Sequence, residues 1–297
     1  MVKPQFFNNI AHPHAGMSFP IVRGISLQPI LFSQVPAWDA ALGKLVSFIE
    51  SAGQSSEFNL SDAKTVMSTK VIPFLQARFP GPGQLSPPSA ASASPQLLTQ
   101  WTSLTVALSK VLPPPELFPL VDFWRLGLLD NDLSVWVAAE AAARKTDVTQ
   151  ILLNEAIGVL DTTFPNPRNL ILTTIRLLAN CFTNASLARH LLDPSPGVFI
   201  SSRSLSPRQN LTALLIPALL HGDALVRTAA ASLTFNLAAH YQRPLIEAQK
   251  NGKRGETMTD NASEGQGDWE MEIVSAVLEA LEREKQSEDV GEYRCTV

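Results

Sequence analysis

The chain has 297 residues, of which 45% are hydrophobic and 17% are charged, and its formal net charge is −4. This is enough apolar material for a sizeable core in one or two domains. No apolar run approaches the roughly 20 residues that a membrane span needs, and Pro4 interrupts the place where a signal peptide would be apolar. Cys181 and Cys295 are too few for a disulfide framework or a zinc site. We therefore expect a protein of the cytoplasm, the nucleus or both, without metal or other cofactor.

The charge is unevenly distributed along the chain. Residues 164–245 contain seven Arg and two Asp, a net charge of +5, whereas residues 246–297 carry −7. Arg suits the fork-like recognition of carboxylates and phosphates, so the basic block indicates an acidic partner. A solvated arginine face is the alternative. The sequence pI of about 5.8 and the lack of interleaved aromatic residues argue against nucleic acid.

The N-terminal part divides into an arm, two helical segments and a loop. Residues 1–33 have no helical period and contain four Pro, which predicts an extended arm that packs on the rest of the protein. The apolar spacing predicts a helix from about Val35, and then a second one capped by Ser61-Asp62 and bent by Pro73. Residues 80–95 form a low-complexity loop rich in Pro and Ser.

Further helices follow densely along the chain. They are predicted at 96–111, 116–129, 132–145, 147–161, 168–183, 185–192, 207–221, 223–240 and 268–286. Asp132, Asp147, Ser206 and Asp223 are the expected caps. Residues 251–267 are polar and Gly-rich, which predicts a disordered loop. Without any sustained period-2 alternation the chain is predicted to be all-α, and short helices with brief turns favour a helical solenoid over residues 34–290.

Two of these helices are alike. The segments 174–182 (TIRLLANCF) and 230–238 (AASLTFNLA) each carry one Asn near the C-terminal end, and Asn180 and Asn236 lie 56 positions apart. That distance fits one helical repeat with a long connecting loop. Chance similarity between helices rich in Leu and Ala is the alternative interpretation.

The residues for catalysis are missing. Nucleophilic catalysis needs a nucleophile, a base and an orienting group within hydrogen-bond reach, but Cys181 lies on an apolar helix and is expected to be a buried structural thiol. His190, His221 and His240 lie near helix ends, and no strand precedes a phosphate-binding loop. We expect no catalytic residues.

Four segments of the chain match a family pattern: 118–126 (FPLVDFWRL), 169–182 (NLILTTIRLLANCF), 226–238 (VRTAAASLTFNLA) and 269–285. They resemble the PUL domain of phospholipase-A2-activating protein and its yeast relatives. The resemblance covers roughly residues 19–289. It implies an armadillo-like solenoid of helical repeats with a right-handed superhelix.

The resemblance also implies a function. The family binds the acidic C-terminal tail of the valosin-containing AAA ATPase in ubiquitin-dependent protein turnover. In armadillo-type arrays, Asn side chains in the groove bind the backbone of an extended peptide while basic residues pair with its acidic groups. We therefore expect Asn180 and Asn236 to hold the tail's main chain, and Arg125, Arg176 and Arg227 to receive its carboxylates. The alternatives are a helix cap or an inter-repeat hydrogen bond for each Asn, and pairing with a neighbouring acidic residue for each Arg.

Two other classes of function remain open. Fungal relatives carry this domain downstream of a deSUMOylating PPPDE peptidase and a thioredoxin module, so the chain is alternatively the C-terminal part of such an isopeptidase. The third interpretation is a scaffold solenoid without a peptide groove. For the tail-binding adaptor we expect a monomer that binds neither nucleic acid nor membrane.

The family pattern also leads to an expectation about the C-terminus. An acidic turn and another apolar helix follow the last matching helix in the family, whereas here Ser287–Val290 reaches that turn and residues 291–297 are a tail that does not match. An array without its terminal helix exposes the apolar face of the previous repeat. We expect Ile273, Val277 and Leu281 to keep partners, part of the last repeat's apolar surface to lie open, and the tail to be poorly ordered.

Overall fold

The computed structural model describes residues 26–52, 59–80, 93–143, 145–160, 164–165, 167–195, 205–250 and 266–294. Every regular element in these ranges is a helix, so the fold is all-α. The loops predicted at 80–95 and 251–267 lie largely outside the described ranges, as do most of the predicted arm and residues 295–297. No helix in the described ranges is both long and apolar enough to cross a membrane.

The array begins with α1 (Trp38–Ser51), α2 (Leu60–Val66), α3 (Ile72–Arg78) and α4 (Pro95–Val111), and a π-helical segment (Met67–Val71) joins α2 to α3. The cap of α2 is Asn59, whose Oδ1 accepts hydrogen bonds from the backbone N–H groups of Ser61 at 3.0 Å and Asp62 at 3.3 Å. The predicted cap, Ser61-Asp62, is therefore wrong by two residues. The π-helical segment comes directly before Ile72-Pro73, and Pro73 cannot donate a helical hydrogen bond.

The middle of the array consists of a 3₁₀ turn (Pro114–Leu117), α5 (Phe118–Gly127), α6 (Asn131–Ala142), α7 (Val148–Gly158), α8 (Arg168–Asn180), a second 3₁₀ turn (Cys181–Thr183) and α9 (Ala185–Leu191). Asp147 caps α7, as predicted, by accepting from the N–H of Gln150 at 3.1 Å. Asp130, and not the predicted Asp132, caps α6 through the N–H of Leu133 at 3.0 Å.

The array ends with α10 (Pro207–Leu219), α11 (Ala224–Lys250) and α12 (Gln266–Arg294). Ser206 and Asp223 cap α10 and α11 as predicted. Two predicted ends are wrong. The helix predicted to end at His240 continues to Lys250, because Pro244 is exposed and water can satisfy the carbonyl that its ring leaves unpaired. The turn predicted at Ser287–Val290 is absent, since α12 is continuous to Arg294.

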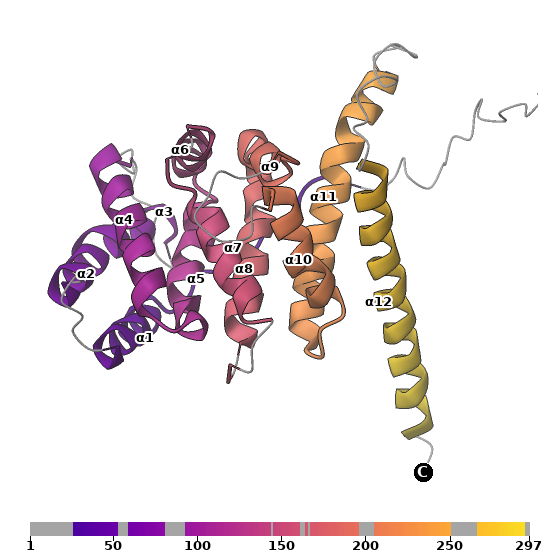
Figure 1. The fold of residues 1–297 in the computed structure, drawn as a ribbon, viewed down its shortest axis with the longest axis horizontal. Coiled ribbons are helices and arrows are strands. Elements are labelled where there is room, and N and C mark those ends of the chain that lie inside the picture. The colour runs from indigo at the N-terminus through magenta and orange to yellow at the C-terminus, as the bar shows by residue number, and fades with distance from the viewer. Residues whose placement is uncertain are drawn as a thin grey trace, which may run out of the picture.

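The helices follow one another in chain order from one end of an elongated array to the other (Figure 1), with α1 to α4 at one end and α12 at the opposite end. One continuous apolar core connects them, from Leu45 in α1 to Ala276 in α12. Its largest members, Trp101 and Trp124, stack with ring centroids 3.9 Å apart, and Trp124 Nε1 donates to Thr105 Oγ1 at 2.8 Å. This arrangement is that of an armadillo-like helical solenoid, as predicted.

Two further features frame the functional site. Residues 26–37, which we call the arm, have no regular secondary structure and lie against the helices from α11 to α5. At the far end of the array α12 buries Ile273 and half-buries Val277, whereas Leu281 is 62% exposed, contrary to the prediction. Part of the apolar surface of the last repeat is therefore open, as expected.

Candidate peptide-binding site

The two matched Asn residues hold the backbone of the arm. Asn236, in α11, accepts a hydrogen bond from Ile30 N at 2.6 Å and donates from Nδ2 to Ile30 O at 2.8 Å. Asn180, in α8, does the same to Phe32, with distances of 2.8 and 3.0 Å. Each side-chain amide thus pairs with both polar groups of one residue, as a neighbouring β-strand would. The pair is a clamp for extended main chain, and the segment it holds belongs to the same protein.

Each Asn also joins two repeats. Asn180 Nδ2 donates to Arg125 O in α5 at 2.8 Å, and Asn236 Nδ2 donates to Ala179 O in α8 at 3.1 Å. An inter-repeat hydrogen bond was one alternative to peptide binding for each Asn. The structure contains both this bond and the clamp. Both side chains are buried, and a buried amide is costly unless its groups are paired. Pairing to the next repeat fixes the orientation in which each amide meets the arm.

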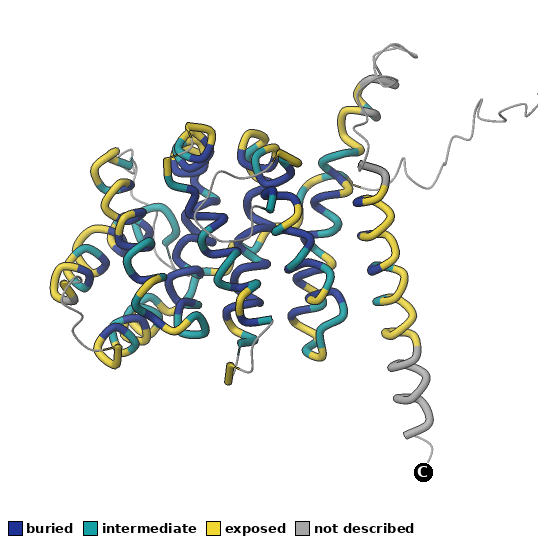
Figure 2. Tube along the Cα trace, in the orientation of Figure 1, coloured by how far each residue is buried: buried dark blue, intermediate teal, exposed yellow. Residues whose placement is uncertain are grey.

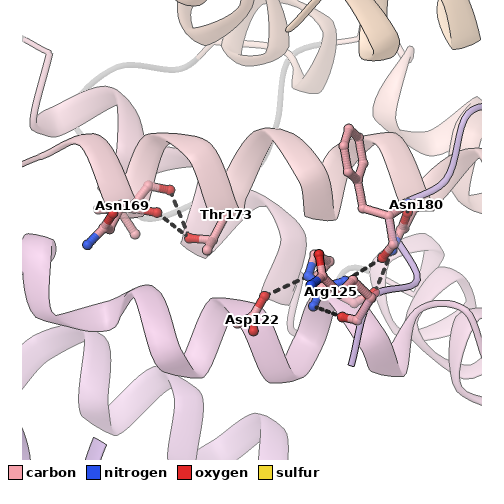
Figure 3. A network of polar contacts seen from close by, with 8 residues as sticks. Asp122, Arg125, Asn169, Thr173 and Asn180 are labelled. Carbon is pink, nitrogen blue, oxygen red and sulfur yellow. Dashed lines mark hydrogen bonds and ion pairs between the residues drawn. The ribbon is translucent and has the colours of Figure 1, made fainter. Parts of the chain in front are cut away.

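Arg125 forms a third rung for the arm, next to Asn180 (Figure 3). It lies in α5, 55 residues before Asn180, and its guanidinium donates to Phe32 O and, at 2.8 Å, to Gln34 O. Its Nε donates to Asp122 Oδ1 at 2.6 Å. Since the side chain is only 5% exposed and its donors face these oxygens, Arg125 stabilises the arm and has little capacity left for a separate ligand.

The arm runs against the order of the helices. Ile30 contacts α11, Phe32 contacts α8 and Gln34 contacts α5, so every second residue meets the next rung, as in an extended chain. At the α11 end Arg243 Nη2 donates to Leu27 O at 2.9 Å. The sequence alone does not reveal that the arm itself fills the Asn clamp. The one feature of the sequence that could have indicated this is the lack of charge in the arm, since residues 26–37 contain no Asp, Glu, Lys or Arg.

A cavity of about 390 Å³ opens beside the arm, lined by Leu31–Pro36, Asp122, Arg125 and Arg176. The guanidinium of Arg176 lies over the Phe32 ring, 5.3 Å from its centroid. Its Nε is buried without a hydrogen-bond partner, and the side chain forms no ion pair among the described residues. Burial and then the positive charge of Arg125 lower the pKa of Arg176. Arg176 is therefore a cation at a cavity, and its charge is poorly compensated.

Arg227 lies apart from this cavity. Its Nε pairs with Glu284 of α12, and its Nη1 donates to His221 O at 2.9 Å and Gly222 O at 3.0 Å. These contacts tie the turn before α11 to the last helix. The structure thus brings Arg125, Arg176, Asn180 and Asn236 together along the arm and places Arg227 elsewhere.

The remaining candidate groups for chemistry are engaged in structure. Burial raises the pKa of the Cys181 thiol well above its usual range, which makes it a poor nucleophile. His190 Nε2 lies 2.5 Å from Asp147 Oδ2, on the carboxylate that caps α7. The described part of the chain contains no group of three His, Cys, Asp or Glu side chains that could hold a metal ion.

An array of helices that holds an extended segment on regularly spaced Asn and Arg side chains is a protein-binding solenoid of the armadillo type. The family model of the PUL domain matches residues 26–295, and the chain therefore belongs to the PUL domain family. This confirms the family that the four segments resemble. The PUL domain is a protein-interaction module and not a catalytic one. Because the match begins at Ser26, it includes the arm. Neither a curated protein nor a solved structure gave a match.

Proposed function

We propose that the protein is an adaptor that binds the acidic C-terminal tail of the valosin-containing AAA ATPase, in ubiquitin-dependent protein turnover in the cytoplasm or nucleus. The observation that carries this proposal is the guanidinium of Arg176, which lines the cavity beside the arm and has no ion-pair partner among the described residues. A carboxylate of the tail supplies the negative charge and the acceptor that this side chain lacks. The expectation from the family and the chemistry of the cavity therefore agree on an acidic ligand.

The surroundings of Arg176 favour an anion. Arg125 and Arg168 both add positive potential at this side chain, and Asp122, which raises the pKa of Arg176, is already paired with Arg125. The arm that closes one side of the cavity is uncharged. Such a site excludes part of the solvent, so a bidentate Arg–carboxylate pair is stronger there than on an open surface. The volume of about 390 Å³ suits a few side chains and not a folded partner.

The arm changes the role proposed for the Asn pair. While Ile30 and Phe32 occupy Asn236 and Asn180, the tail cannot use the same amides. We infer that the tail docks beside the arm, and that the Asn pair and Arg125 act by holding the wall of the cavity in place. The alternative is a tail that displaces the arm and takes over its hydrogen bonds.

The proposal is tested with matched substitutions. A labelled peptide of roughly the last ten residues of the ATPase is titrated with the wild-type chain and with Arg176→Gln and Arg227→Gln, and binding is read by fluorescence anisotropy. Loss of the cavity cation should weaken binding by about 2 kcal/mol, or roughly 30-fold, whereas Arg227→Gln should have little effect. Unchanged affinity in Arg176→Gln would contradict the cavity as the site. Absence of tail binding by the wild-type chain would contradict the function.

Amide hydrogen exchange decides whether the arm stays. If the tail docks beside it, the N–H groups of Ile30 and Phe32 remain as protected as in the free protein, because Asn236 and Asn180 still accept their hydrogen bonds. If the tail replaces the arm, both amides lose protection when the tail is added. This measurement is independent of the affinity comparison.

A further inference from the structure

The last helix carries two apolar faces, and only one of them is covered. Trp269, Ile273 and Ala276 are buried, and Trp269 Nε1 donates to Thr212 Oγ1 of α10 at 2.6 Å. A second set of apolar residues, nearly on the opposite side of the helix, is open to solvent. This set, the α12 stripe, consists of Met271, Val274, Leu278 and Leu281, with exposed fractions of 65, 49, 61 and 62%. Figure 2 shows that much of the surface of α12 is exposed along its described length.

The spacing within the α12 stripe is that of a helix–helix contact. Its residues follow one another at intervals of three, four and three, which is the a/d pattern of a coiled-coil seam. Nine large hydrophobic residues are exposed in the described part of the chain, and four of them are in this stripe. Single exposed apolar residues need no explanation, but a continuous row of them marks an interaction surface.

The charges around the α12 stripe define what it binds. Glu279 and Glu282 border it on one side and Glu270 and Glu284 on the other, where the helical repeat places them. Glu279 is paired with Arg283 and Glu284 with Arg227, and Lys285 lies one turn beyond Leu281 on the face of the stripe. Helix α12 contains nine Asp or Glu against three Lys or Arg. A second copy of the same helix would bring like charges together along the seam, and an anionic membrane surface would be repelled for the same reason.

We propose that the α12 stripe is a docking site for a basic amphipathic helix of a partner protein. The partner places apolar side chains against Met271, Val274, Leu278 and Leu281 and Lys or Arg side chains against the bordering glutamates, as amphipathic helices do in other grooves. This surface lies at the end of the array, on a different helix from those that line the cavity. The adaptor thus has a second binding surface, which prefers a basic ligand, whereas the cavity prefers an acidic one.

The test uses two synthetic helical peptides of about five turns that share one apolar stripe. The first carries Lys at every flanking position and the second carries Glu at the same positions. Binding to the full chain is measured by fluorescence anisotropy at low and at physiological salt. We expect the Lys peptide to bind, with an affinity that falls as salt is added, and the Glu peptide not to bind. Equal binding of both peptides, or of neither, overturns the proposal.

Variants locate the site on the chain. The double substitution Leu278→Glu/Leu281→Glu should reduce the affinity for the Lys peptide by at least about tenfold, while the exposed positions leave the melting curve unchanged. The charge reversal Glu279→Lys/Glu282→Lys should transfer binding to the Glu peptide. Unchanged Lys-peptide binding in both variants places it elsewhere on the acidic protein and overturns the proposal. The proposal is also overturned if the wild-type chain sediments as a dimer and Leu278→Glu/Leu281→Glu sediments as a monomer, since the stripe then binds a second copy.

Discussion

Replacing Asn180 by Ala should destabilise the protein more than any other single change in the clamp. The side chain makes three hydrogen bonds, with Phe32 N at 2.8 Å, Phe32 O at 3.0 Å and Arg125 O at 2.8 Å. It is fully buried, so water cannot readily replace the lost amide. A buried polar group left without a partner costs about 1–3 kcal/mol. The substitution leaves the Arg125 carbonyl and at least part of the Phe32 backbone without a hydrogen-bond partner. We therefore expect a loss of about 2–5 kcal/mol in the free energy of unfolding.

Asn236→Ala removes the same number of bonds but should cost less. Its partner Ile30 is 44% exposed, so water can reach the freed backbone groups there. Only the carbonyl of Ala179, bound at 3.1 Å, is left in a buried position. We expect a loss of about 1–2 kcal/mol, together with greater mobility of the arm, which amide hydrogen exchange at Ile30 would detect.

Urea unfolding of the two variants and of a matched control measures this difference. Asn169→Ala makes the same substitution on α8 at an exposed position, and should change the free energy of unfolding by no more than about 0.5 kcal/mol. A loss below about 1 kcal/mol in Asn180→Ala, or equal losses in Asn180→Ala and Asn236→Ala, would refute the reasoning that burial sets the cost.

Two further predictions concern the core and the effect of pH. Gly127→Ala should lower the free energy of unfolding by about 1–3 kcal/mol, which a thermal melt would detect. The reason is that a Cβ at this position would lie 2.5 Å from Leu133 Cδ2 and 3.0 Å from Trp101 Cη2. An unchanged melting temperature would mean that Leu133 moves freely to make room. Burial alone would lower the pKa of His190, but the hydrogen bond and charge of Asp147 raise it overall. The pair therefore stabilises the fold below the ordinary His pKa of about 6.5 and loses this contribution as pH rises through the raised value. His190→Gln should flatten the unfolding free energy between about pH 6 and 8, and an unaltered pH profile would contradict the pairing.

Local patterns in the sequence were sufficient to predict the class of fold. The 3.6-residue period and the caps predict most helices because both depend on residues only a few positions apart. The two misplaced caps occur where a competing local partner exists. Asn59 and Asp130 cap α2 and α6 in place of neighbouring candidates, and Asp130 additionally pairs with Arg78 at 2.8 Å, a contact that no short window contains.

The candidate site was predictable in part. The matched helices gave the positions of Asn180 and Asn236 and the kind of group they bind, which is extended main chain. They could not indicate whose main chain it is, because Ile30 and Asn236 are 206 residues apart and backbone groups carry no sequence code. Arg125 was expected to bind a carboxylate of a ligand. Asp122, three residues earlier on the same helix, and two arm carbonyls take its donors instead.

Because the clamp recognises only backbone, it cannot by itself distinguish one peptide from another, and specificity has to come from side chains at its edge. Phe32 is the arm's contribution to that edge, since its ring lies under the guanidinium of Arg176 and holds it at the cavity. The proposed acidic ligand would then meet a cation positioned by the arm, on a wall held by Asn180 and Asn236. The arm is thus a structural component of the proposed binding site, and the family match, which begins at Ser26, includes it.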